Sequence, residues 1–419
     1  MEKIAIVFPG QGSQFVGMGE RFYESYDIAK KTYEEACEVL NFNVMDLCFK
    51  GSLLKLNKNH NMQVAVFVTN VAISRVYFEE IKIPPQFCAG HSVGEYSALV
   101  AAGAVSFRDA LKMIEYRGKL SNKIYAENTG SMSIVENIDL NTLKAIIPEN
   151  VFISNYNSQN QFTICAENQV LEKTETELIE NGAKVTPLLA SPPFHSPLMG
   201  SIREDFKKYL KQFRYYPLRF PIILNISGKP FCAFEKIPDV LSDQLIKPVL
   251  WYDSVKSLEF YGVTKIIEMG PKNLVMNLID NSIKDKSIQL YCFSQKKDRA
   301  DLMKLFSGME NYKTNIPQFL PRCLAFAVST PNRNWDKKEF TTGVIEPYEN
   351  IMKIVNDLEE KNKEPDIEQM KQGLELLKKI LTTKKIPAEE QENCFKQLLD
   401  ETNTYYLFNN SNILSEIAV

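Results

Sequence analysis

The sequence has little net charge, no long hydrophobic run and no cysteine clusters. Its formal net charge is −3 over 419 residues, which argues against a protein that binds nucleic acid or anionic membranes. No uninterrupted apolar run reaches about 18 residues, so we expect no membrane-spanning helix. The eight cysteines include no C-x-x-C pair, which argues against a metal site such as zinc and against a disulfide framework.

The first residues lack the features of a secretory signal peptide. MEKIAIVFPGQGSQ contains the acidic Glu2 and only a short apolar run, whereas signal peptides combine a positively charged start with a longer apolar segment. We therefore expect a cytoplasmic protein with reduced thiols. The chain also shows no internal repeat and no low-complexity segment.

The order of the apolar segments favours an α/β fold. Residues 4–8 (IAIVF) form a continuous apolar run that enters the Gly-rich stretch P-G-Q-G-S-Q, which is typical of a buried strand in a parallel sheet. Residues 86–90 lead into a second sharp turn. Helical patterns follow over 61–79, 95–102 and 107–121, the last with Ser106 as its N-cap. Strand, turn and helix in this order indicate a layered α/β domain.

Residues 128–191 have the pattern of a separate small subdomain. The order of predicted elements is β-α-β-β-α-β, which is the ferredoxin-like arrangement. The strands are expected at 131–135, 151–156, 161–166 and 184–189, and the helices at 139–146 and 168–181. We expect this subdomain to be inserted into a larger α/β body that spans residues 1–308.

Residues 309–419 differ in composition from the preceding part of the chain. Prolines 317, 321, 331 and 347 predict a loop-rich start, with RCLAFAV at 322–328 as a possible strand. A helix is predicted from Asp366, because apolar residues repeat every three or four positions along one face. This mainly helical region either covers an apolar face of the body or docks on another protein.

A serine between two glycines, at G-H-S-V-G, lies where the predicted strand 86–90 meets the next helix. Glycines permit the tight turn that presents Ser92 alone, as in a nucleophile elbow. The N–H groups at the start of the following helix favour negative charge on an attacked carbonyl. Ser92 is therefore a candidate nucleophile.

A nucleophilic serine needs a general base, and the chain contains three histidines. His91 adjoins Ser92 and is expected to support the turn instead, because neighbouring side chains diverge. His60 lies in the polar stretch LNKNHNMQ and is predicted at the surface. His195 lies in the apolar segment LLASPPFHSPLM, where an imidazole needs a polar partner. By elimination His195 is the predicted base, although no acidic residue near it stands out.

Six motifs occur in order along the chain: FPGQGSQ (8–14), GHSVGEYSALVAAGA (90–104), YRGKL (116–120), NYNSQNQ (155–161), PFHSPLM (193–199) and EMGP (268–271). With them the chain resembles the malonyl-CoA:acyl carrier protein transacylase family over residues 1–308. It is most similar to the free-standing acyltransferases that serve polyketide synthases in trans, since Lys272 replaces the glycine usual in the housekeeping enzymes. The resemblance implies an α/β-hydrolase-like body with a ferredoxin-like insert.

The resemblance also implies roles for individual residues. Ser92 would take the acyl group as an ester and His195 would act as its base. The backbone N–H groups of Gln11 and Val93 would form the oxyanion hole. In this family a main-chain carbonyl near N-P-V-Q-W orients the histidine; the segment here is KPVLW, which assigns that carbonyl to Leu250.

Arg117, in YRGKL, would bind the free carboxylate of a malonyl group through two parallel hydrogen bonds. The implied substrates and partners are malonyl-CoA and the acyl carrier protein domains of a polyketide or fatty acid synthase, with no cofactor and a monomeric enzyme. Phe194 favours malonyl over methylmalonyl. Two alternatives stay open: a proofreading acyl hydrolase on the same scaffold, and a docking protein with a vestigial transferase body. Intact Ser92, His195 and Arg117 argue against the second.

Overall fold

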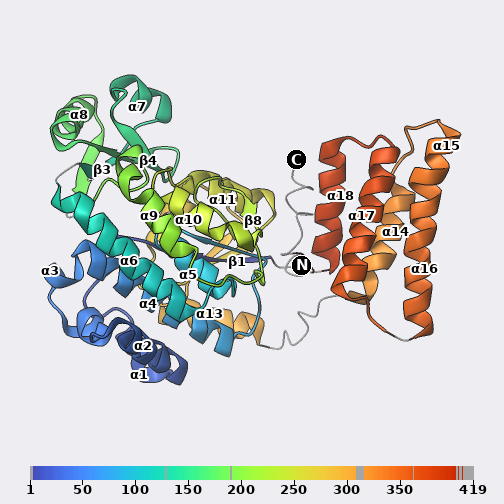
Figure 1. Ribbon diagram of the computed structural model, residues 1–419, viewed down its shortest axis with the longest axis horizontal. Coiled ribbons are helices and arrows are strands. Elements are labelled where there is room, and N and C mark those ends of the chain that lie inside the picture. The colour runs from blue at the N-terminus through green and yellow to red at the C-terminus, as the bar shows by residue number, and fades with distance from the viewer. Residues whose placement is uncertain are drawn as a thin grey trace. The chain divides into compact units, whose positions relative to one another are not determined.

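The structure is a computed structural model that describes residues 3–127, 130–188, 191–307, 316–361, 363–402, 404 and 408 (Figure 1). The chain divides into two compact units. We call Glu2–Leu218 with Ile222–Ser307 the N-terminal unit, and the helices that follow residue 315 the C-terminal unit. None of the described helices is long and apolar enough to cross a membrane.

A six-stranded sheet lies at the centre of the N-terminal unit, in the order β10-β9-β1-β2-β7-β8. Neighbouring strands are parallel except for the antiparallel pair β7–β8. All five residues of β1 are buried, because a central parallel strand has both faces covered. The strands are β1 (Ile4–Phe8), β2 (Phe87–Gly90), β7 (Ile222–Ile223), β8 (Pro230–Phe231), β9 (Lys265–Glu268) and β10 (Gln289–Cys292).

Helices surround this sheet, and the longest of them, α4 (Asn59–Glu80), is largely buried. It contacts α2, α5 and α6, and its run VAVFV is apolar on every side, as expected of a helix buried all round. The other helices of the unit are α1 (Glu20–Ser25), α2 (Asp27–Leu40), α3 (Leu53–Leu56), α5 (Gly94–Ala101), α6 (Phe107–Ala126), α9 (Gly200–Leu210), α10 (Ile237–Gln244), α11 (Trp251–Phe260), α12 (Leu274–Asp280) and α13 (Lys296–Phe306).

The predicted ferredoxin-like subdomain is present. Its four strands form a separate antiparallel sheet in the order β4-β5-β3-β6, and its own apolar cluster includes Val135, Leu143 and Phe162. The elements are β3 (Ser131–Glu136), α7 (Leu140–Ile146), β4 (Phe152–Tyr156), β5 (Gln161–Ala166), α8 (Asn168–Glu180) and β6 (Lys184–Leu188). Each lies within about two residues of its predicted range, the usual uncertainty of element ends. Residue 189, the predicted end of the last strand, lies outside the described residues.

The C-terminal unit is helical. The predicted helix from Asp366 is confirmed as α17: the Asp366 side chain accepts from the Gln369 N–H, and the Gln369 side chain accepts from the Asp366 N–H. Its apolar face, including Leu374, Leu377 and Leu381, is buried, and α17 contacts α14 and α16. The helices are α14 (Phe319–Ser329), α15 (Lys337–Phe340), α16 (Glu346–Glu360), α17 (Ile367–Thr383) and α18 (Ala388–Thr402).

Two predictions for this region are wrong. Residues 322–328 are not a strand but part of helix α14, and the loop-rich start is largely helical. Pro321 lies in the first turn of α14, where a helix has no partner for the missing N–H. Pro347 is the second residue of α16, which directly continues the π-helical turn Thr341–Ile345. The predicted boundaries at 128 and at 308/309 fall outside the described residues and stay predictions. The fold class itself is confirmed: an α/β body with a largely parallel sheet, a ferredoxin-like insert and C-terminal helices.

Candidate active site

Ser92 lies in the turn between β2 and α5. Its φ is 52°, a left-handed conformation that costs a non-glycine residue about 1–2 kcal/mol. The flanking glycines make the turn possible, because a Cβ at Gly90 would collide with the backbone of Gly94, and a Cβ at Gly94 would collide with the backbone of Phe8. The geometry is that of a strained strand-to-helix elbow with the hydroxyl at its tip.

The structure brings His195 to Ser92 across 103 residues of sequence. The distance between Ser92 Oγ and His195 Nε2 is 2.7 Å. On the other side of the ring, His195 Nδ1 lies 2.6 Å from the main-chain oxygen of Gln244. A carbonyl can only accept, so Nδ1 carries the proton and Nε2 is free to accept the serine proton.

Burial keeps this imidazole neutral. His195 is almost fully buried, and desolvation, followed by the nearby Arg117 charge, lowers its pKa to about 3. Its own backbone is also left-handed, with φ 61°, and is held by a bond from its N–H to the main-chain oxygen of Leu245 at 2.8 Å. An unprotonated, oriented ring beside a serine hydroxyl has what a general base requires.

The prediction that the Leu250 carbonyl orients His195 is wrong. The Leu250 oxygen accepts from the backbone N–H and the hydroxyl of Ser254, inside α11. The orienting oxygen belongs to Gln244, the last residue of α10. Carbonyls in the last turn of a helix have no partner within the helix, so this one is available to the imidazole.

The two other histidines have different surroundings. His91 is buried with its Nε2 2.9 Å from Asn157 Oδ1 and its ring against Trp251, a supporting position as predicted. His60 is not a surface residue: it is half-buried on α4, and its ring lies directly against Gly118. Its Nδ1 has no hydrogen-bond partner in the part of the chain that the structure describes, and burial lowers its pKa. The polar residues around His60 suggested an exposed position, but the residue lies on α4 and its side chain faces the interior.

The predicted oxyanion donors are available. The backbone N–H groups of Gln11 and Val93 donate to no other group in the described part of the chain. Gly10 places the loop close to the elbow, because a Cβ there would collide with the main-chain oxygen of His91. Two free N–H groups near the serine match the donors that stabilise a tetrahedral oxyanion.

Arg117 is buried on α6, with 1% of its surface exposed. Its Nη1 donates to Gln63 Oε1, and its guanidinium lies over the Phe194 ring at 4.2 Å. Among the described residues no acceptor lies within hydrogen-bond geometry of its Nε and Nη2. Burial lowers the pKa of the guanidinium, and the nearby buried Tyr96 hydroxyl partly offsets this effect. Leaving a buried donor unpaired costs about 1–3 kcal/mol, so the structure carries an unsatisfied cationic fork beside the loop that holds His195.

Four residues of the site were missed from the sequence. Asn225, Glu95 and Gln244 surround the backbone of Ser92, and Gln63 orients Arg117. Three are uncharged amides scattered through the sequence, and no spacing connects them. Glu95 lies in the quoted elbow motif, and a carboxylate in a hydrophobic run was the signal available for it.

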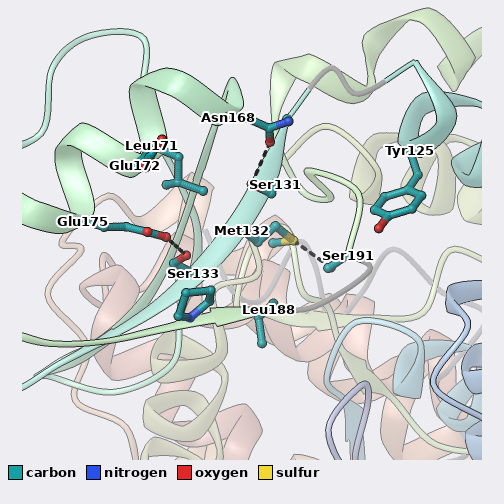
Figure 2. A pocket seen from close by; sticks show the side chains of 12 residues that line it. Tyr125, Ser131, Met132, Ser133, Asn168, Leu171, Glu172, Glu175, Leu188 and Ser191 are labelled. Atoms are coloured by element: carbon teal, nitrogen blue, oxygen red, sulfur yellow. Dashed lines mark hydrogen bonds between the residues drawn. The ribbon is translucent and has the colours of Figure 1, made fainter. Parts of the chain in front are cut away.

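A cavity of about 320 Å³ is lined by β3, α8 and β6 of the insert, together with Tyr125 of α6 and Ser191 (Figure 2). None of Ser92, His195 and Arg117 lines it. Its polar groups bond to one another: Ser131 Oγ donates to Asn168 Oδ1 at 2.9 Å, and Ser133 Oγ donates to Glu175. The cavity is therefore separate from the serine site, and the polar side chains of these two pairs already have hydrogen-bond partners.

Residues 5–315 match the acyl transferase domain family. A malonyl CoA-acyl carrier protein transacylase of Bacillus subtilis is 33% identical over 402 residues, which cover 94% of this chain and all of that protein. This chain belongs to the acyl transferase family. Among the described residues of this acyl transferase, no three His, Cys, Asp or Glu side chains are grouped to hold a metal ion.

Other similar proteins match only the N-terminal part of this acyl transferase. A malonyl CoA-acyl carrier protein transacylase of Bacillus subtilis strain 168 is 38% identical, covering 67% of this chain and 90% of that protein. The crystal structure of an acyl carrier protein S-malonyltransferase from Vibrio cholerae has a TM-score of 0.68 at 33% identity, covering 72% of this chain and 100% of that one. A malonyl-transacylase in complex with its type II PKS acyl-carrier protein has a TM-score of 0.67 at 31% identity, covering 73% and 100%. The C-terminal unit is thus additional to the fold of these solved structures, whereas the 94% match extends into it.

Proposed function

We propose that this acyl transferase moves a malonyl group from malonyl-CoA to the phosphopantetheine thiol of an acyl carrier protein. One observation carries the proposal: Ser92 Oγ lies 2.7 Å from the unprotonated Nε2 of His195, in a site that also holds a buried arginine with two unpaired donors. The names of the similar proteins support the same reaction.

The first half-reaction makes a seryl ester. Ser92 Oγ attacks the thioester carbonyl carbon while His195 Nε2 takes the hydroxyl proton. The carbonyl oxygen becomes an oxyanion that accepts from the N–H groups of Gln11 and Val93, and the start of α5 adds a favourable dipole. When the tetrahedral intermediate collapses, the C–S bond breaks and His195 gives its proton to the sulfur of coenzyme A. The carbonyl of Gln244 stabilises the transient imidazolium through Nδ1.

The second half-reaction repeats these steps in reverse with another thiol. His195 removes the proton of the carrier-protein thiol, and the sulfur attacks the ester carbonyl carbon. When this second intermediate collapses, the bond between the acyl carbon and Ser92 Oγ breaks, and His195 returns the proton to Ser92 Oγ. Every bond change uses groups of the chain and its two substrates, so we propose that no cofactor takes part. One base and one oxyanion site serve both half-reactions, because the donor and the product are both thioesters and both half-reactions pass through a tetrahedral oxyanion at the same carbonyl carbon.

Arg117 selects for malonyl in this proposal. A guanidinium fork with two unpaired N–H groups matches a carboxylate, which an acetyl group lacks. The Phe194 ring against the guanidinium narrows the space beside the carboxylate, which favours malonyl over the bulkier methylmalonyl. A proofreading hydrolase needs no carboxylate site, so the buried arginine also favours transfer over hydrolysis.

The finer proposals concern the synthase that is served. We propose that the chain works in the cytoplasm, as a monomer, and supplies a polyketide synthase in trans; a fatty acid synthase is the other possible acceptor. Support comes from Lys272 and from the additional C-terminal unit, which the solved transacylases of similar fold do not match.

Intact-protein mass spectrometry tests the reaction. The full chain is mixed with malonyl-, methylmalonyl- or acetyl-CoA, and then with a holo carrier protein. We expect a malonyl adduct on the enzyme that disappears as the carrier protein gains the same mass. An adduct that is lost equally fast to water without a carrier protein would indicate the hydrolase instead.

A further inference from the structure

Side chains hold the strained backbone of Ser92 on both sides. The Ser92 N–H donates to Asn225 Oδ1 at 2.7 Å. The Ser92 carbonyl accepts from Gln244 Nε2 at 3.1 Å. A residue with positive φ persists only where its surroundings over-determine it, and here the two peptide groups that define this φ and ψ are each fixed by an amide from a distant segment.

A single carboxyl group joins these two amides. Glu95 Oε1 accepts from the Asn225 N–H at 2.8 Å and from Asn225 Nδ2 at 3.2 Å, while Glu95 Oε2 accepts from Gln244 Nε2. We propose that Glu95 is a positioning residue. By holding Asn225 and Gln244, it keeps Ser92 Oγ and His195 Nε2 at hydrogen-bonding distance. The proposal rests on the transfer reaction proposed above and deepens the account of that same site.

The connection reaches His195 through the backbone of Gln244. The same residue that holds the Ser92 carbonyl with its side chain orients His195 Nδ1 with its main-chain oxygen at 2.6 Å. A displacement of Gln244 therefore moves both partners of the 2.7 Å contact between Ser92 Oγ and His195 Nε2. Asn225 adds a link to the strand, because its Nδ2 donates to the Gly90 main-chain oxygen at 2.6 Å.

The chemistry of the position calls for an acid. Three N–H donors converge on Glu95, and a carboxylate accepts all of them, whereas the amide of a glutamine would place N–H against N–H on one side. Glu95 is fully buried in the first turn of α5, where the helix dipole favours negative charge, and the Arg117 charge lies near enough to interact with it. Burial raises the pKa of Glu95 to about 7, because the cost of desolvating the carboxylate exceeds what its hydrogen bonds and the Arg117 charge offset.

Glu95→Gln in the full chain tests this role, with Glu268→Gln as the matched control. Glu268 is also a fully buried carboxyl whose pKa burial raises, to about 8. It instead accepts the backbone N–H groups of Val275 and Met276 at the start of α12. Two rates are measured for each variant: malonyl loading from malonyl-CoA, and covalent labelling of Ser92 by a fluorophosphonate, a general reagent for activated serines.

We expect Glu95→Gln to lower kcat for loading and the labelling rate together by about 100-fold, the scale of a 1 Å misplacement in an active site. The KM for malonyl-CoA should stay unchanged, because Arg117 keeps its donors. Glu268→Gln should retain both rates. Wild-type rates in Glu95→Gln, or equal losses in both variants, would overturn the proposal.

A second variant covers the case in which Glu95→Gln does not fold. Gln244→Met removes the side-chain bonds to Glu95 and Ser92 but keeps the main-chain oxygen that His195 uses. It should slow labelling without changing the KM for malonyl-CoA, and unchanged labelling would overturn the proposal. A wild-type chain whose Ser92 reacts with the fluorophosphonate but takes no malonyl group would refute the transfer function while leaving the positioning role measurable.

Discussion

The two units of the chain bury polar side chains for different purposes. In the N-terminal unit a buried carboxyl, Glu95, converges with amides from distant segments around one serine. In the C-terminal unit the buried Lys384 donates to the main-chain oxygens of Ala327 and Thr330, at 2.6 and 2.9 Å, at the C-terminal end of α14. Buried polar groups need partners in either case, but only the first set surrounds a reactive group.

Left-handed backbone shows the same contrast. Lys385, with φ 58°, directly follows the C-cap of α17, where such a conformation is an ordinary way to end a helix. Ser92 and His195, with φ 52° and 61°, lie in the candidate active site and are held by long-range hydrogen bonds. A left-handed residue that distant segments hold in place therefore indicates a functional site. A left-handed residue next to the last turn of a helix is an ordinary helix end.

Removing the serine should have the largest effect. Ser92→Ala should abolish the malonyl adduct, because no other group can form the ester. Intact-protein mass spectrometry after mixing with malonyl-CoA gives the answer directly, with the wild-type chain as the control. If the mutant still loads, another residue is the nucleophile. The buried polar groups around Ser92 would then not differ in purpose from those of the C-terminal unit.

Removing the base should have the next largest effect. His195→Ala should slow both loading and transfer by about 10²–10⁴-fold, since general acid–base assistance is worth that much and one imidazole serves both steps. Single-turnover rates measure each step separately. The matched control is His60→Ala, which removes a histidine outside the Ser92–His195 contact and should load normally; near-normal rates in His195→Ala would contradict the assignment.

Removing the arginine should change selectivity more than overall rate. Arg117→Ala should reduce malonyl loading about 10- to 100-fold, since hydrogen bonds to charged groups contribute about 1.5–3 kcal/mol, while acetyl loading stays or improves. Competition between malonyl-CoA and acetyl-CoA, read by mass, measures the ratio. Equal losses for both substrates would mean that Arg117 serves only the packing of α6.

Weakening the C-terminal unit should have the smallest effect on loading. Leu377→Ala empties a fully buried position of α17, which should cost about 2–5 kcal/mol in the stability of that unit. Loading from malonyl-CoA should stay unchanged, because the solved transacylases of similar fold do without this unit. Circular dichroism measures the unfolding and mass spectrometry the loading.

The same variant addresses the docking idea. If the helices recognise a synthase, transfer to the native acceptor should weaken more than transfer to a generic carrier protein. Equal transfer to both acceptors would speak for a purely structural role, and lost loading would show that the two units depend on each other.

The elements that local patterns specify could be predicted from the sequence. The apolar run 4–8, the Ser106 cap and the helix start at Asp366 all lie where they were expected, because each depends on residues within one or two turns. Segment 322–328 was misjudged, since a short apolar run suits a strand or a buried helix equally.

The sequence alone determined the candidate nucleophile and base: two glycines mark Ser92, and the scarcity of histidines leaves His195. Only the tertiary structure decided how the pair is held. The oxygen that orients His195 belongs to Gln244, which lies 49 positions away in the sequence. It is a main-chain atom, so the residue type at that position does not reveal it. The inward turn of His60 and the unpaired donors of Arg117 were settled in the same way. Periodicity reports the local backbone, whereas burial and hydrogen-bond pairing depend on segments that meet only after the chain has folded.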